Sequence, residues 1–188
     1  MRILITFLTL AASVIAGILS GTGSSAASAT DPPCVPTKNS TVWSWPLAGA
    51  WSRAGPAILR PFEPPRHRWS PGHRGVDLAG SADAPVLAAG PGVVLFAGRL
   101  VDRGVVVIGH GVIRTSYEPV EAALRVGARV SLGERIGTLD PGHCTPGACL
   151  HWGLLTGRGH GTTYFDPLVL LGCGRVRLEP VEAAPRSR

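Results

Sequence analysis

The sequence predicts an all-β fold, an antiparallel sandwich or barrel-like sheet with very little helix. From residue 75 onward, the chain consists of short, β-branched apolar segments separated by glycines, which is typical of the strands of such folds. Proline-rich stretches before this region exclude long helices there. No segment indicates a helix longer than one or two turns.

The residues before the glycine-punctuated region are predicted to form an arm and a loop. Residues 42–47 are typical of a first strand or an extended arm. Residues 53–72 contain five prolines, which exclude most central strand positions. We therefore expect a long surface loop at 53–72, and long loops in compact domains are often functional.

Seven short apolar segments are the predicted strands: residues 75–78, 86–89, 92–97, 105–108, 112–117, 135–139 and 149–155. The sequence Gly109-His110-Gly111 predicts a hairpin turn between two of them, because glycine adopts positive φ without steric cost. Residues 126–134 alternate apolar and polar side chains around tight turns.

One short helix is predicted at residues 167–171. Asp166 is a suitable N-cap, Pro167 suits the first helical position, and Gly172 suits the end. Beyond this helix, residues 173–188 form a polar tail that we expect to fray.

The N-terminus is typical of an export signal. Arg2 precedes an apolar run over residues 3–19, and Ala27-Ser28-Ala29 resembles a cleavage site. The alternative is a retained anchor, since the run lies at the lower limit of membrane-spanning length. The small residues favour cleavage. We therefore expect a secreted, extracellular chain with no membrane span in its mature form.

The predicted organisation has four parts: a signal peptide at 1–29, an N-terminal arm and Pro-rich loop at 30–72, a β domain at 73–172 and the tail at 173–188. The mature chain is long enough to bury the core of one domain, and we expect a monomer. The formal net charge of +6 favours anionic partners. No cluster of basic and aromatic residues indicates nucleic-acid binding, so the anionic partners expected outside a cell are wall polymers or membrane surfaces.

Four cysteines in an exported chain indicate two disulfides. Of the three pairings, we favour Cys34–Cys173, which joins the ends of the domain, together with Cys144–Cys149, which closes a short loop. The alternative is that the thiols are reduced.

Three side chains indicate a metal site. His73 and Asp77 are four residues apart, and Gly75 between them lets the chain turn. His151 lies on a predicted strand, on the same face as Cys149. Two imidazoles and one carboxylate would give zinc three protein ligands and one open position, as in catalytic zinc sites. Alone, H-x-x-x-D is a weak signal, and each histidine could equally ligate nothing.

The sequence around these residues carries a more specific pattern. The segments 84–94, 104–117, 126–137 and 150–154 follow His73 and Asp77 in order and at suitable spacing. Over residues 73–168, the chain resembles the lysostaphin-type (LytM-like) family of zinc endopeptidases, which cut the peptide cross-links of bacterial cell walls. The resemblance implies an antiparallel β fold with an open groove, and one Zn²⁺ bound by His73, Asp77 and His151 on its floor. It also implies peptidoglycan or another anionic wall polymer as the partner.

Two positions depart from the family. The resemblance places non-ligating histidines at residues 119 and 149, where this chain has Pro119 and Cys149. In the family, these histidines would activate water and stabilise the oxyanion. Acid–base groups typically contribute about 10²–10⁴-fold and an oxyanion donor about 10²–10³-fold to the rate. Their loss would therefore remove several kcal/mol of transition-state stabilisation.

Cys149 has three interpretations: half of a disulfide with Cys144, a fourth zinc ligand that closes the site, or the nucleophile of a Cys–His pair.

His143, in the loop before the His151 strand, is the candidate replacement for the missing histidines, with an exposed loop histidine as the alternative. Three hypotheses follow: an active zinc hydrolase of wall peptides, a catalytically inactive wall-binding or regulatory module, such as an activator of other wall hydrolases, and a protein that keeps zinc only as a structural staple.

Overall fold

The computed structural model describes residues 42–49, 55–67, 69–144 and 147–173. All of them belong to one compact unit, Pro33–Arg188. The predicted signal peptide, Cys34 and the tail beyond Cys173 lie outside the described residues. Within the described ranges, no helix has the length and apolar character needed to cross a membrane.

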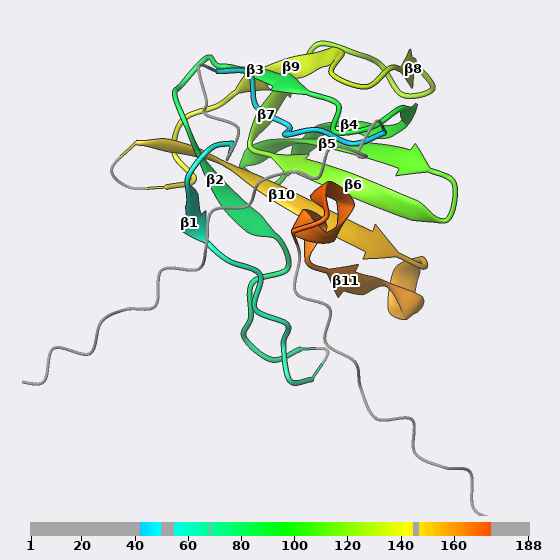
Figure 1. Cartoon of the computed structure of the whole chain (residues 1–188). Coiled ribbons are helices and arrows are strands. Elements are labelled where there is room, and N and C mark those ends of the chain that lie inside the picture. The colour runs from blue at the N-terminus through cyan, green and yellow to red at the C-terminus, as the bar shows by residue number, and fades with distance from the viewer. Residues whose placement is uncertain (1–41, 50–54, 68, 145–146, 174–188) are drawn as a thin grey trace, which may run out of the picture. The chain divides into compact units, whose positions relative to one another are not determined.

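Two antiparallel sheets form the fold, which confirms the all-β prediction (Figure 1). The larger sheet has the order β1-β2-β10-β6-β5-β4-β8, with β11 paired to β10, and the smaller has the order β3-β9-β7. The larger sheet contains β1 (Ile58–Arg60), β2 (Val76–Gly80), β4 (Gly92–Leu100), β5 (Arg103–His110), β6 (Ile113–Glu118), β8 (Arg129–Val130), β10 (Ala148–Thr156) and β11 (Thr163–Phe165). The smaller contains β3 (Pro85–Leu87), β7 (Val120–Ala122) and β9 (Arg135–Leu139).

Helix in the described residues is limited to two 3₁₀ segments, η1 (Gly159–Gly161) and η2 (Pro167–Leu171). The second matches the predicted helix: Leu168 N–H donates to Asp166 Oδ1 at 2.9 Å, and Gly172 ends it at φ 78°. Its i→i+3 bonds, such as Val169 N–H to Asp166 O, make it a 3₁₀ helix, as is common for so short a segment.

The predicted hairpin at 109–111 is displaced. Strand β5 continues through Gly109 and His110, and the turn lies at Gly111-Val112, where Gly111 has φ 85°. Residues 42–47 form an extended arm instead of a strand, joined to β3 by an isolated bridge between Leu47 and Val86.

The expected loop at 53–72 is partly a strand. β1 lies within it and pairs with β2. This is possible because Ile58–Arg60 contains no proline, so each of its residues keeps the backbone N–H that a strand needs for pairing. Its side chains are exposed, so no apolar alternation indicated the strand. The short strands β7, β8 and β11 were also not predicted, because segments of two or three residues carry too little pattern.

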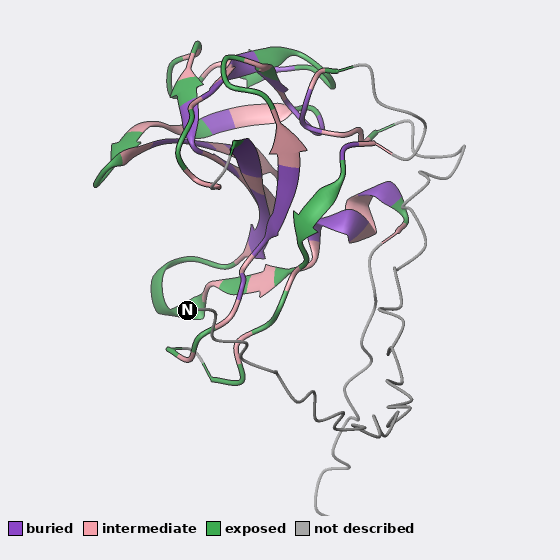
Figure 2. Ribbon diagram, turned by 90° about the vertical axis from the view of Figure 1, so that its left-hand side faces the viewer, coloured by how far each residue is buried: buried purple, intermediate pink, exposed green. Residues whose placement is uncertain are grey.

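Alternation along β2 and β10 separates the core from the candidate site. Val76 and Leu78 of β2, with Leu150 and Trp152 of β10, are fully buried in the hydrophobic core. The residues between them, including Asp77 and His151, face the other side of the sheet. Figure 2 shows the buried residues concentrated on the central strands. The core therefore fixes the strands from which the candidate ligands project.

Candidate metal centre

Strand register brings Asp77 and His151 together. β2 and β10 pair antiparallel, with His151 directly opposite Asp77 and Leu150 opposite Leu78. Opposite residues on one face have Cβ atoms about 4.5–5.5 Å apart, which suits a side-chain contact. Accordingly, His151 Nδ1 lies 2.8 Å from Asp77 Oδ1.

His73 approaches the same carboxylate from the segment before β2. Its Nε2 lies 3.0 Å from Asp77 Oδ1 and 3.0 Å from His151 Nδ1. A bridge to Glu63 holds its backbone, with the two N–H···O bonds at 2.8 and 2.9 Å. The ring is held separately, because His73 Nδ1–H donates to Pro61 O at 2.7 Å. The proline-rich segment thus positions His73.

The three side chains fit a divalent cation. A carbonyl oxygen only accepts, so the bond to Pro61 places the proton on Nδ1 of neutral His73 and leaves a lone pair on Nε2. That lone pair faces the Asp77 oxygen and the His151 nitrogen, and a cation among them would satisfy all three atoms. Tetrahedral zinc bonds of about 2.0–2.2 Å imply ligand separations of about 3.3–3.6 Å, a few tenths longer than those here.

Burial and neighbouring charge act in opposite directions on Asp77. Burial alone would raise the pKa of its carboxyl group. The hydrogen bond from His151 and the electrostatic attraction of the three surrounding histidines outweigh burial, so the pKa of Asp77 lies below its ordinary value. The carboxylate is therefore ionised and ready to bind a cation.

Gly75 is required by the position of His151. A Cβ atom on residue 75 would lie 2.4 Å from Trp152 O and 2.6 Å from His151 Nε2. Real Cβ atoms do not approach other atoms so closely, so any larger residue would displace the imidazole. The glycine of the H-x-G-x-D pattern thus leaves room for a ring from another strand.

His143 lies beside the triad. Its Nε2 is 3.4 Å from Asp77 Oδ1, and its ring centroid is 5.7 Å from that of His151. Its side chain is 22% exposed, compared with 8% for Asp77 and 12% for His151. It does not group with all three triad atoms within 4.8 Å, as a fourth tetrahedral ligand would. His143 therefore stands at the solvent side of the carboxylate.

A disulfide holds the loop that carries His143. Cys144 and Cys149 are bonded, in agreement with the predicted pairing, and their Cα atoms are 5.6 Å apart. This bond occupies the sulfur of Cys149, so in this state Cys149 is neither a zinc ligand nor a nucleophile. The predicted pair Cys34–Cys173 includes a residue outside the described ranges.

Pro119 and Cys149, which stand where the resemblance implies histidines, supply no hydrogen-bond donor at these positions. Pro119 is buried between β6 and β7 and has no N–H. Cys149 is fully buried in its disulfide. Glu118, which precedes Pro119, pairs with His151 in the sheet but has no described contact with the triad.

No other histidine of the described residues groups with the triad as a possible metal ligand. His110 Nδ1–H donates to Pro91 O at 2.7 Å, and its Nε2 lies 2.8 Å from Thr115 Oγ1, so it connects strands. Burial lowers the pKa of His110. Trp152 is fully buried, whereas Trp69 is 84% exposed.

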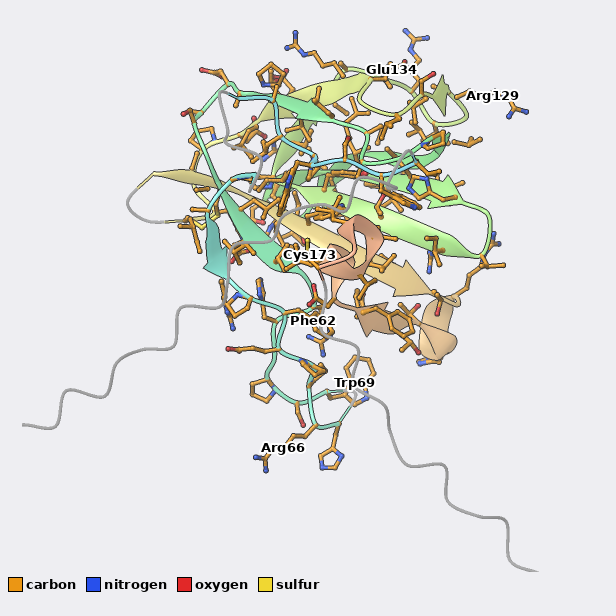
Figure 3. All side chains as sticks on the ribbon, viewed as in Figure 1. Phe62, Arg66, Trp69, Arg129, Glu134 and Cys173 are labelled. Carbon is orange, nitrogen blue, oxygen red and sulfur yellow. A yellow bond between two sulfur atoms is a disulfide. The ribbon has the colours of Figure 1, made fainter. Side chains whose placement is uncertain are left out.

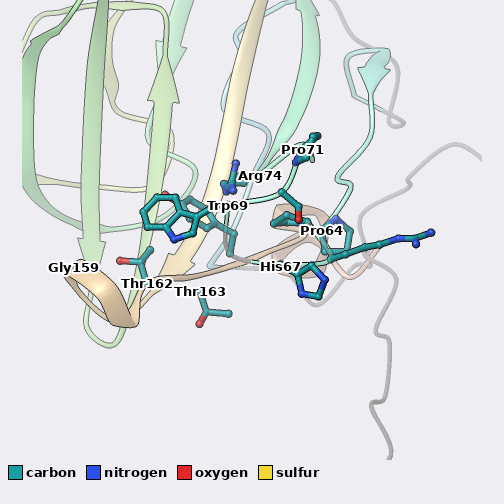
Figure 4. Close-up of a pocket in the computed structure, with 12 residues that line it drawn as sticks. Pro64, His67, Trp69, Pro71, Arg74, Gly159, Thr162 and Thr163 are labelled. Carbon is teal, nitrogen blue, oxygen red and sulfur yellow. The ribbon is translucent and has the colours of Figure 1, made fainter.

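A pocket of about 880 Å³ adjoins the segment that carries His73 (Figure 4). It lies between the proline-rich segment and the η1–β11 region, and Trp69, Thr162 and Arg74 line it. The guanidinium carbon of Arg74 lies 5.8 Å from the centre of the Tyr164 ring, within range of a cation–π contact. The sequence pattern did not indicate that Arg74 and Tyr164 would take part in such a pocket.

The family assignment comes from comparison with known proteins. The model of "Peptidase family M23" matches residues 71–167, just over half of the chain. The chain belongs to peptidase family M23. The lysostaphin-type resemblance is thereby confirmed.

Similar sequences occur in mycobacteria. Uncharacterized proteins of Mycobacterium tuberculosis and Mycobacterium bovis are 49% identical to the chain over 146 residues. The match covers 76% of this chain and 57% of each relative, so the chain spans little more than half the length of these proteins.

Solved structures share the M23 fold. A zinc-containing peptidase from Vibrio cholerae is 25% identical with a TM-score of 0.52, over 61% of this chain and 37% of that one. Lysostaphin from Staphylococcus simulans is 22% identical with a TM-score of 0.55, over 70% of this chain and 57% of that one. At this identity, the second similarity shows the fold alone.

Proposed function

We propose that this M23 chain is a secreted zinc metallopeptidase that cuts peptides of bacterial peptidoglycan. The observation that carries the proposal is the placement of Asp77 Oδ1 within 3.0 Å of an imidazole nitrogen of both His73 and His151. A buried carboxylate between two imidazoles is a donor set that suits one Zn²⁺.

Each side chain has a distinct role in this proposal. His73, Asp77 and His151 hold the cation, with His73 oriented by Pro61. Bound zinc supplies Lewis-acid polarisation of a carbonyl and activation of water. His143 Nε2, on the solvent side of Asp77, is the chain's own group for moving a proton near the metal. It takes the place of histidines that this chain lacks at positions 119 and 149.

The substrate class follows from charge and from the adjoining pocket. The chain carries a net charge of +6, and Arg66 and Arg74 line the pocket with Trp69. Cationic groups beside an exposed aromatic ring suit an anionic polymer with a peptide branch. Peptidoglycan has this chemistry, and it is the substrate we propose.

The test is chelator-sensitive release of new amino groups from purified wall material. We expect the full chain to release them, 1,10-phenanthroline to stop the release, and added Zn²⁺ to restore it. A matched variant, Asp77→Asn, keeps the size of the side chain and should release none. If the folded, zinc-loaded chain releases no amino groups from walls or from isolated wall peptides, the peptidase proposal is wrong.

A second candidate is a catalytically inactive wall-binding or regulatory module, favoured by the residues at Pro119 and Cys149. Such a protein would bind walls and zinc but release no amino groups. Sedimentation with insoluble walls separates the two, because an inactive module would co-sediment with walls and leave them chemically unchanged. If zinc is purely structural, its removal should instead unfold the chain.

A further inference from the structure

A second set of metal-binding atoms lies next to the triad. The ligand atoms of Asp77, His143 and Cys149 all lie within 4.8 Å of one another. One of them, Cys149 Sγ, is occupied by the disulfide to Cys144. We propose that reduction of this disulfide opens an alternative metal site, Asp77–His143–Cys149, for a thiophilic divalent cation such as Zn²⁺. The proposal rests on the proposed function, because it assumes that the chain binds zinc.

The backbone already directs Cys149 toward Asp77. Cys149 and His151 are two residues apart on β10 and share a face of the sheet. Cys149 pairs with Ala79 on β2, next to the pair formed by His151 and Asp77. Because these pairs belong to the sheet, breaking the disulfide leaves the position of Cys149 fixed. Cys144 lies in the loop and has no such anchor.

The chemical step is a two-electron exchange. A dithiol reductant transfers two electrons and two protons to the Cys144–Cys149 bond, giving two thiols, and is itself oxidised to a disulfide. The Cys149 thiol releases its proton when its sulfur binds the cation. Sulfur donors favour zinc over harder cations such as magnesium. The cation then replaces the disulfide as the link between strand β10 and the loop that carries His143.

The two sites compete for one cation. Asp77 Oδ1 faces His73 and His151 at 3.0 and 2.8 Å and faces His143 at 3.4 Å. A single carboxylate oxygen serves both sets, so a cation held through Cys149 displaces one held by the two triad histidines. Oxidised and reduced chains therefore bind the same number of cations through different atoms.

The test uses two variants of the full chain that both lose the disulfide. Cys144→Ser leaves the sulfur at residue 149, and Cys149→Ser removes it. Each is titrated with Co²⁺, which absorbs in the near ultraviolet by charge transfer when sulfur ligates it. We expect this band in Cys144→Ser only, with no band in Cys149→Ser or in the oxidised wild type. Adding His143→Ala to Cys144→Ser should weaken Co²⁺ binding by about tenfold or more.

The outcomes separate this proposal from the proposed function. If the oxidised wild type binds no Co²⁺, the zinc peptidase proposal is wrong. If it binds Co²⁺ but folded Cys144→Ser binds it without a sulfur band, only the alternative site is contradicted. Two bound equivalents in Cys144→Ser would contradict the competition.

A second measurement needs no variant and applies even if Cys144→Ser does not fold. The wild type is reduced with dithiothreitol, freed of reductant without air, and alkylated with iodoacetamide with and without Zn²⁺. Peptide mass spectrometry should show that Zn²⁺ protects Cys149 and leaves Cys144 reactive. Equal alkylation of both cysteines in the presence of Zn²⁺ would overturn the proposal.

Discussion

The Nε2 atom of His143 lies 3.4 Å from Asp77 Oδ1, in a chain that has Pro119 and Cys149 where the lysostaphin-type resemblance implies histidines. The disulfide that occupies Cys149 is also the one that ties down the loop of His143. A cysteine thus stands where the resemblance implies a histidine, and its disulfide restrains the loop that carries another histidine. This relationship makes His143 the first residue to test.

His143→Ala should reduce turnover on wall peptides while leaving zinc bound. We expect kcat to fall by about 10²–10⁴-fold, the usual contribution of a proton-transfer group. Zinc content should match the wild type, because His143 is not one of the three ligands in the oxidised chain. The control is His160→Ala, an exposed position in η1. An unchanged kcat in His143→Ala would show that His143 is an exposed loop histidine that takes no part in catalysis.

Gly75→Ala should weaken zinc binding without changing any ligand. The added methyl group would meet Trp152 O and His151 Nε2 at 2.4 and 2.6 Å, so the His151 ring must move. Loss of ligand orientation typically lowers metal affinity by about 10–100-fold. Competition with a chromophoric chelator measures this change.

The matched control is Gly161→Ala, where an added Cβ would have no neighbour within 4 Å. It should bind zinc like the wild type. If Gly75→Ala binds zinc as tightly as the wild type, zinc binding does not depend on the present position of the His151 imidazole.

Tyr117 should make the fold sensitive to alkali. Burial raises the pKa of Tyr117 to about 12, and the hydrogen bonds that Thr115 Oγ1 and Ala89 N–H donate to its hydroxyl offset only part of that rise. The folded state thus holds this proton more tightly than the unfolded chain. Its contribution, about 2–3 kcal/mol, is fully present below pH 10 and is lost as the pH rises toward 12.

Denaturant unfolding between pH 9 and pH 12, compared with Tyr117→Phe, measures this effect. The phenylalanine variant should lose less stability over that range than the wild type. At neutral pH, it should be about 1–3 kcal/mol less stable, because Ala89 N–H loses its acceptor. Parallel pH profiles for the two proteins would contradict the assignment, and Tyr164→Phe serves as the control.

Arg66→Glu should weaken wall binding more than Arg129→Glu, which makes the same change in charge. Arg66 lines the pocket, whereas Arg129 lies on β8 at the other end of the fold (Figure 3). Both variants change the net charge equally, so nonspecific attraction falls equally. Co-sedimentation with purified walls at increasing salt compares them. Equal losses would mean that overall charge, and not the pocket, holds the polymer.

The sequence predicted most of the frame of the site. Glycine-punctuated apolar segments indicated the strands, and the alternation Val76-Asp77-Leu78 placed the carboxylate on the face opposite the core. The pairing of Asp77 with His151 depends on the register of two strands far apart in sequence. Only the family resemblance could indicate that register, because no local pattern encodes it.

What the sequence could not predict is the support of the site. Pro61 O orients His73 through a backbone carbonyl, and every residue type, proline included, supplies the same carbonyl acceptor. β1 was missed because its side chains are exposed and prolines flank it. His143 was identified as a candidate because it lies in the loop before the His151 strand, but only the structure brings it to Asp77.

The zinc content of the purified full chain tests the central claim most directly. Elemental analysis after dialysis against zinc and then buffer should give about one equivalent for the wild type and for His143→Ala. It should give less than about a tenth of an equivalent for His151→Ala, because two ligands do not retain the ion. A folded wild type without zinc, or a His151→Ala variant that binds as much as the wild type, would contradict the account.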